Sequence, residues 1–158
     1  MLIPMEITSF ALDPGRNTPV IILREKSGER TLPVPVGPLE AGAIAIQSLE
    51  VTPEKPLSID LAKLVMEQLG GRLRHVVIHD IVEQRLLARL NIVSEKGTAV
   101  IECRPSDAIA MAMRCDAPLF AEEQLLNRDA DGERTPGQDL RRSIRSMDTI
   151  DFGSYFME

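Results

Sequence analysis

One helical motif occurs twice in this chain, and this repeat constrains the fold more than any other feature. Residues 38–46 read Pro, any residue, an acid, Ala, any residue, Ala, Ile or Met, Ala, Ile or Met, and residues 105–113 follow the same pattern. Self-similarity of this kind indicates a duplicated supersecondary unit. We therefore predict two like halves, at about residues 1–70 and 71–127.

Each copy of the motif follows three strand-like segments. They are rich in apolar and β-branched residues, are separated by turn signals such as Asp13-Pro14-Gly15, and cover residues 5–12, 19–25 and 30–36 and then 72–82, 84–94 and 98–103. Pro33 and Pro35 cannot donate ladder hydrogen bonds. The third strand is therefore predicted to lie at an edge or to be bulged.

Helices are predicted after each set of strands. One begins at Pro38 and another covers residues 105–114, because proline suits a first helical turn. A further helix over residues 58–69 has Ser58 as its N-cap. Residues 118–122 echo residues 56–60, so a shorter helix is predicted over 121–126. The predicted fold is α+β, with duplicated units of three strands and two helices forming a single curved, barrel-like sheet with the helices packed outside.

Residues 1–127 form one predicted domain, and residues 128–158 form a linker and tail. Three of the chain's five aromatic residues lie in the last seven positions, Phe152, Tyr155 and Phe156, so the tail is predicted to dock on the core or on a partner subunit.

Composition narrows the class of protein. The net charge of −6 argues against a large basic surface for nucleic acid, although a local basic groove remains compatible with it. The two cysteines are predicted to be small buried apolar groups of a protein in a reducing compartment. Neither a signal peptide nor an apolar run of membrane-spanning length is visible, so we expect a cytoplasmic protein with no membrane association.

Glu40 and Asp107 occupy the same place in the two motif copies and are the main candidate site residues. As structural groups, they would complement the dipole of a helix start. As functional groups, they would meet across a pseudo-twofold axis and hold a divalent cation, an ion that phosphodiester hydrolysis commonly uses. Asp60 is a further candidate, and Glu122 and Asp80 are weaker ones.

Arg104 places a cation at a helix start, where it opposes the dipole, so we expect it to have an acidic partner or a phosphate ligand. Ser106 would cap the same helix or contact a ligand. His75 and His79 lie four residues apart in a strand-like segment, a span of about 13 Å that is too long for two ligands of one ion. They are predicted to be ordinary surface or hairpin histidines.

Three blocks, residues 36–41, 56–61 and 104–110, together resemble the bifunctional nuclease domain family. The resemblance covers nearly all of residues 5–127. It implies a usually dimeric protein of duplicated units around one barrel-like sheet, with nuclease activity toward DNA and RNA. Members of the family often place His before the acid that matches Asp60, whereas this chain has Ile59.

Two hypotheses follow. The first is a metal-assisted phosphodiesterase in which Glu40 and Asp107 hold Mg²⁺ or Mn²⁺, Asp60 supports the ion, and Arg104 and Ser106 bind the nucleic acid phosphate. The second is a non-enzymatic, dimeric regulatory or binding module in which the same acids and Arg104 form a structural polar network between the two halves. Solvent exposure distinguishes the two hypotheses, because the catalytic assignment fails if Glu40, Arg104 and Asp107 are paired and closed to solvent.

Overall fold

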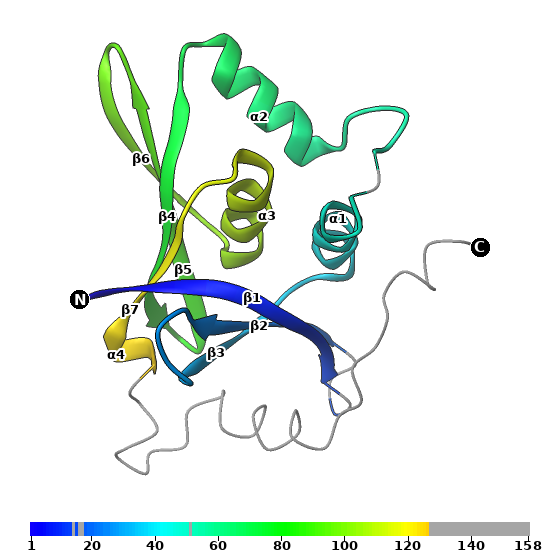
Figure 1. Ribbon diagram of the computed structural model, residues 1–158, viewed down its shortest axis with the longest axis vertical. Helices are drawn as coiled ribbons and strands as arrows, with labels where there is room; N and C mark the ends of the chain where they lie inside the picture. Colours follow the sequence, from blue (N-terminus) through cyan, green and yellow to red (C-terminus); the bar gives the residue numbers. More distant parts are fainter. Residues whose placement is uncertain (14, 16–17, 51, 127–158) are drawn as a thin grey trace.

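The computed structural model of the chain describes residues 1–13, 15, 18–50 and 52–126. The described part is an α+β fold (Figure 1). In chain order, its elements are β1 (Leu2–Asp13), β2 (Thr18–Glu25), β3 (Thr31–Pro35), α1 (Pro38–Ser48), α2 (Ser58–Gln68), β4 (Arg72–Val82), β5 (Arg85–Ser94), β6 (Gly97–Cys103), α3 (Pro105–Cys115), β7 (Leu119–Glu122) and α4 (Glu123–Leu126).

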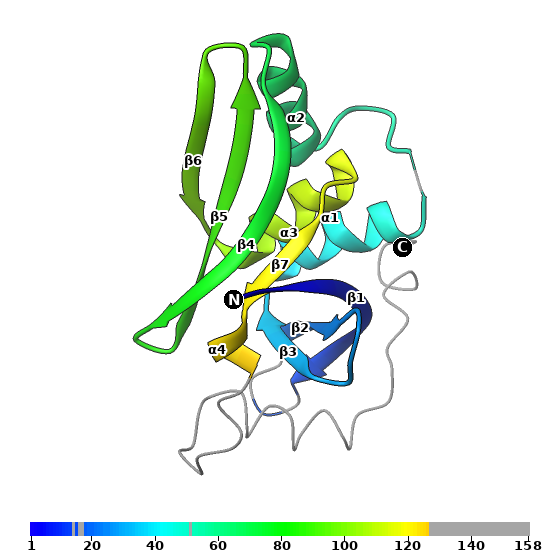
Figure 2. The ribbon, with the colours of Figure 1, turned by 60° about the vertical axis from the view of Figure 1, so that its left-hand side comes forward.

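A seven-stranded sheet carries the fold, in the order β3-β2-β1-β7-β4-β5-β6. Each half contributes an antiparallel three-stranded meander followed by a helix, β1-β2-β3-α1 and β4-β5-β6-α3. The two meanders run in clearly different directions, so the sheet is strongly bent (Figure 2). The described strands do not close into a barrel, because β3 and β6 are its two edges.

The short strand β7 joins the two halves. It pairs antiparallel with β1 and parallel with β4, so it fills the gap between the two meanders. The prediction of a helix over residues 121–126 was therefore wrong for its first part, and only Glu123–Leu126 is helical. Leu119 and Ala121 are buried and alternate with less buried neighbours, as expected for a strand. Ladder hydrogen bonds on both sides outweigh the helical tendency of so short a segment.

The two halves differ at this point. Residues 56–60 lead into helix α2, whereas the matching residues 118–122 enter strand β7. Both halves thus contain three strands followed by a helix, the second helix has no described counterpart, and the internal duplication stays a prediction. At the sheet edge, the prediction from Pro33 and Pro35 is confirmed, because β3 is an edge strand.

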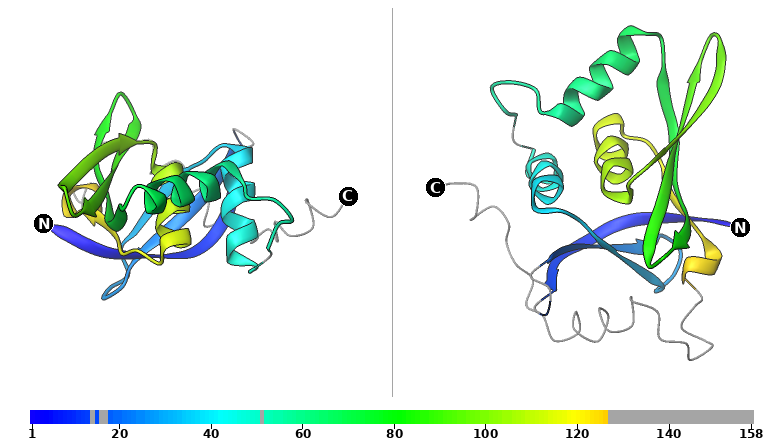
Figure 3. Two further views of the ribbon diagram at one scale, coloured as in Figure 1. Left: turned by 90° about the horizontal axis from the view of Figure 1, so that it is seen from above. Right: turned by 180° about the vertical axis from the view of Figure 1, so that it is seen from behind.

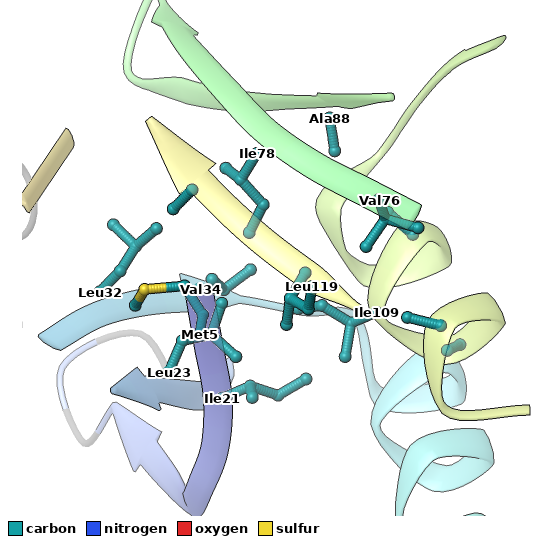
Figure 4. Packing of buried hydrophobic residues seen from close by; sticks show 14 of the residues in the cluster. Met5, Ile21, Leu23, Leu32, Val34, Val76, Ile78, Ala88, Ile109 and Leu119 are labelled. Atoms are coloured by element: carbon teal, nitrogen blue, oxygen red, sulfur yellow. The ribbon is translucent and has the colours of Figure 1, made fainter. Parts of the chain in front are cut away.

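The core lies between the sheet and the helices α1 and α3. Figure 3 shows the three longer helices on one side of the β4-β5-β6 meander. Ile44 of α1 and Ile109 of α3 are fully buried, as are Ile21 and Leu23 of β2. Figure 4 shows side chains from both meanders meeting Ile109 in one aliphatic cluster. This shared core fixes the starts of α1 and α3 relative to each other.

Within the described residues, no helix is both long and apolar enough to span a bilayer. The predicted docking of the 128–158 tail lies outside the described residues.

Candidate active site at the starts of two helices

Arg104 joins the first-turn acids of α1 and α3. Its Nε donates to Asp107 Oδ2 at 2.8 Å, and its Nη2 donates to Asp107 Oδ1 at 3.0 Å. Its Nη1 lies 2.8 Å from Glu40 Oε1. The two acids that the sequence repeat singled out are thus held by one guanidinium group. We name these three residues the Arg104 cluster.

The Arg104 cluster is open to solvent. The Arg104 side chain is 66% exposed, and those of Glu40 and Asp107 are 22% and 37% exposed. A guanidinium group carries five N–H donors in a planar fork. The three contacts described leave one N–H on Nη1 and one on Nη2 facing no carboxylate of the cluster. The cluster is therefore paired, yet an outside ligand can reach it.

Local sequence explains why these side chains meet. Both helices have Pro at their first position, and Gly37 and Arg104 are the residues at which the chain turns into α1 and α3. A Cβ at position 37 would overlap the carboxylate of Glu40 where it now lies, so glycine leaves room for that side chain to fold back over the helix start. Neither helix start has a side-chain cap. Their partial positive charges therefore partly offset the net charge of −1 that two carboxylates and one guanidinium group give the cluster.

The electrostatics of the cluster keep its arginine charged. The hydrogen bonds from Arg104 to Asp107, and then the charges of Asp107 and Glu40, raise the pKa of Arg104. Next to it, burial raises the pKa of the Cys103 thiol to about 11, and the negative charges of Asp107 and Glu102 act in the same direction. The Cys103 thiol is therefore protonated at neutral pH and does not act as a nucleophile.

Asp60 belongs to a different place. Its Oδ1 accepts a hydrogen bond of 2.6 Å from Arg114 Nε, and its Oδ2 accepts one of 2.9 Å from the backbone N–H of Leu57. Arg114 is buried and also donates to the carbonyl oxygens of Ala43 and Ala110. Asp60 thus ties α2 to α3 and α1, and it has no described contact with the Arg104 cluster.

The other predicted residues also lie apart from the cluster's open side. Ser106 is only 5% exposed, which does not suit a substrate contact. His75 packs edge to face against Phe120, with ring centroids 5.7 Å apart, and His79 Nε2 lies 2.8 Å from Glu102 Oε2. Among the described residues, no group of three or more His, Cys, Asp or Glu side chains is arranged to hold a metal ion.

Sequence reasoning missed Arg114, although it follows the second motif copy directly. Nothing in the local pattern distinguishes it from a solvated residue at a helix end. It also missed Arg30, which forms a two-pronged pair with Glu25 at 2.7 and 2.8 Å and reaches Glu123 of α4. The hydrogen bonds from Arg30 lower the pKa of Glu25.

Comparisons with known proteins place this geometry in context. The model of the bifunctional nuclease domain matches residues 21–132. An uncharacterised protein of Mycobacterium tuberculosis is 34% identical over 122 residues, in strain CDC 1551 / Oshkosh and in strain ATCC 25618 / H37Rv, covering 77% of this chain and 73% of the relative. Bifunctional nuclease 2 of Oryza sativa subsp. japonica is 27% identical over 128 residues, covering 73% of this chain and 38% of the rice protein.

Proposed function

Because the chain belongs to the bifunctional nuclease domain family, we propose that it hydrolyses phosphodiester bonds of DNA and RNA at the Arg104 cluster. A single observation carries the choice of site. An exposed guanidinium group is held at the start of a helix by two carboxylates from different halves of the chain. A side chain fixed in this way is pre-oriented for a ligand and retains free donors.

Arg104 is suited to bind the phosphate. Its remaining N–H groups on Nη1 and Nη2 can donate to two non-bridging oxygens of a phosphodiester, which is the paired geometry that guanidinium favours. The dipoles at the starts of α1 and α3 favour the same anion. The charge that develops on the phosphate during attack by water would be stabilised by these groups.

Hydrolysis also needs a group that takes a proton from the attacking water. Glu40 and Asp107 are the carboxylates in contact with Arg104, so either one lies beside a phosphate bound there. In the proposed reaction, the water oxygen bonds to phosphorus and the carboxylate accepts the water proton. The bond from phosphorus to the leaving sugar oxygen then breaks. That oxygen takes up a proton from solvent, and the carboxylate releases its proton to solvent.

The cluster does not have the form of a ready metal site. Its two carboxylates are both occupied by Arg104, and the described residues supply no third metal-binding side chain. An ion bound between Glu40 and Asp107 would have to displace the guanidinium group. We therefore route no step through a metal, and a requirement for Mg²⁺ or Mn²⁺ stays a prediction that the assay below tests.

The second candidate function is a non-enzymatic regulatory or binding module. The observation that favours it is the same pairing, because Arg104 links α1 to α3 as a structural network would. The exposure of the cluster weighs against it, since a purely structural ion pair at this degree of exposure contributes only about 0–1 kcal/mol to folding.

Purified full-length chain, incubated with plasmid DNA and with RNA in EDTA, Mg²⁺ or Mn²⁺, tests the proposal. Glu40→Ala and Asp107→Ala should each lose most of the cleavage while keeping their far-UV circular dichroism. Glu6→Ala is a matched control, because Glu6 also pairs with an exposed arginine, Arg24, at 2.8 Å. Cleavage that is unchanged in both site variants would contradict the assigned site, and an inactive wild-type protein would favour the regulatory module.

A homodimer is a further prediction, and two exposed apolar regions fit it. Helix α2 has no buried residue, and Leu61, Leu64 and Val65 on it and Leu69 directly after it are exposed. Val100 and Ile101 are exposed on the edge strand β6. Light scattering of the wild type and of Leu64→Glu tests this, since a dimer formed through α2 should dissociate in the variant.

A further inference from the structure

The arginines of this chain fall into two groups. Among the described residues, Arg24, Arg30, Arg104 and Arg114 each contact a carboxylate. The four arginines of β4 and β5, which are Arg72, Arg74, Arg85 and Arg89, make no ion pair within the same described part of the chain. A chain with a net charge of −6 thus leaves these four arginines without a described carboxylate partner along two neighbouring strands, with Arg72 and Arg85 at opposite ends of the hairpin.

One face of strands β4 and β5 lies on the side of the sheet opposite to the helices. Ala88 and Leu90 of β5 are buried in the core, so Arg89 and Asn91, which alternate with them, lie on the opposite face. In register, His75 of β4 lies beside Asn91. Figure 3 shows no helix α1, α2 or α3 on this side of the β4-β5-β6 meander.

Two donors on this face lack partners. Arg89 Nε and Asn91 Nδ2 are both inaccessible to solvent and have no hydrogen-bond acceptor among the described residues. Glu102 lies opposite Arg89 in register, but its Oε2 is 2.8 Å from His79 Nε2 instead. A buried donor without an acceptor is costly, so the side chains of Arg89 and Asn91 would gain by turning outward to an acceptor outside the chain.

Ring surfaces lie beside these donors. Val77 of β4 pairs in register with Phe120 of β7 on one side and with Arg89 of β5 on the other. Phe120 and Arg89 therefore flank the same residue. His75 meets Phe120 edge to face. Burial and the positive charges of Arg74 and Arg89 lower the pKa of His75.

We propose that this face, made of Arg72, Arg74, Arg85, Arg89, Asn91 and Phe120 and here named the basic face, binds single-stranded nucleic acid. Its cations suit the phosphates, and its ring offers a stacking surface of the kind that open sheets present to unpaired bases. Its two unpaired donors would suit phosphate or base oxygens once their side chains turn outward. A duplex has no free base face for such a ring. The choice of nucleic acid as ligand rests on the proposed function.

The position of the basic face connects it to the Arg104 cluster. Strand β6 pairs with β5 up to Cys103, and Arg104 follows directly. Glu102, the register neighbour of Arg89, is thus two residues from Arg104. A single nucleic acid strand that lies across β4, β5 and β6 would lead to the start of α3, where hydrolysis is proposed.

Fluorescence anisotropy with a short labelled oligouridylate, whose integrity is checked on a gel after each titration, tests this inference. We expect the double variant Arg74→Gln/Arg89→Gln to bind at least about tenfold more weakly, and its salt dependence to fall by about 1.4 in slope for two lost phosphate contacts. Arg24→Gln, which removes one paired arginine from β2, should bind within about twofold of the wild type. Should the double variant unfold, Arg72→Gln/Arg85→Gln at two exposed positions replaces it.

The outcomes are separable from those of the nuclease assay. Wild-type protein that fails to bind at low salt, or double variants that bind as well as the wild type, would overturn the inference. Tighter binding of a duplex of the same length would also overturn it. Hydrolysis of bis(4-nitrophenyl) phosphate, a substrate too small to span the basic face, should persist in Arg74→Gln/Arg89→Gln. If the wild type binds as expected but never cleaves, the proposed function fails and the basic face stands.

Discussion

Helix α3 is tied to its neighbours by an arginine at each end, and the two arginines differ in one respect. Arg104, at its start, contacts the first-turn acid of α1, and Arg114, in its last turn, contacts the first-turn acid of α2. The chemistry is the same at both ends. The Arg104 side chain is 66% exposed, however, whereas that of Arg114 is 3% exposed.

This difference separates a structural role from a functional one. Arg114 is fully enclosed, with Asp60 and two backbone carbonyls as its acceptors, so it fixes how the helices pack. Arg104 gains little stability from its exposed acids, and its free donors can bind a ligand. Four changes test this comparison.

The largest effect is expected at the buried end. Asp60→Ala leaves the Arg114 charge without its carboxylate and removes the acceptor of the Leu57 N–H. We expect a loss of about 3–5 kcal/mol in the free energy of unfolding, measured by urea denaturation. A loss below about 1 kcal/mol would mean that the buried pair does not organise the helices.

The next effect concerns the geometry of the open end. Gly37→Ala places a Cβ where the Glu40 carboxylate now lies, so that carboxylate should swing away from Arg104. We expect cleavage to fall by about tenfold to a hundredfold, because displacements of about 1 Å in a site have effects of this size. Gly28→Ala is the control, since its Cβ would meet the Glu25 carboxylate in the same way, away from the Arg104 cluster. Equal activity of the two variants would contradict the role of Glu40.

A smaller effect is expected for the stability of the open end. Asp107→Ala removes the acid that accepts two hydrogen bonds from Arg104, yet both groups are exposed. The free energy of unfolding should change by about 0–1 kcal/mol, again by urea denaturation. A loss as large as that of Asp60→Ala would make the two ends equivalent and remove the reason for assigning function to one of them.

The smallest expected effect is a pH dependence of folding stability that arises at the basic face. The arginines there have no described carboxylate partner, unlike Arg104 and Arg114 at the two ends of α3. Burial and the charges of Arg74 and Arg89 lower the pKa of His75 from its usual 6.5, so below pH 6.5 the unfolded chain binds a proton more readily than the folded one. The wild type should therefore lose stability relative to His75→Gln as pH falls below 6.5. Above pH 6.5, the difference in stability between the two proteins should not change with pH. Thermal melting of both proteins across this range measures it, and a constant difference between the two melting temperatures would contradict it.

Much of this arrangement was predictable from the sequence, for reasons that particular residues make clear. Paired prolines, Pro38 and Pro105, mark two helix starts, and the acids two positions later do meet at one arginine. The dipole argument predicted that Arg104 would need an acidic or phosphate partner, and it has two acids. The edge position of β3 followed from its prolines.

The rest depends on long-range contacts that no local pattern encodes. Residues 119–122 form a strand because β1 and β4 leave a gap for it, although its first residues resemble those before α2. Asp60 was grouped with Glu40 and Asp107 by residue type, and its actual partner is the buried Arg114. The unpaired arginines of β4 and β5 became visible only once the partners of the other four were known.

The rate of RNA cleavage by Arg104→Ala, measured together with the melting temperature of this variant, tests whether Arg104 has a functional role. Loss of a pre-oriented donor to the reacting phosphate should lower the cleavage rate by about 10²–10³-fold. The melting temperature should stay within a few degrees of the wild type, because the removed pairs are exposed. Cleavage at the wild-type rate, or unfolding of the variant, would show that Arg104 is a structural residue like Arg114 and that the site lies elsewhere.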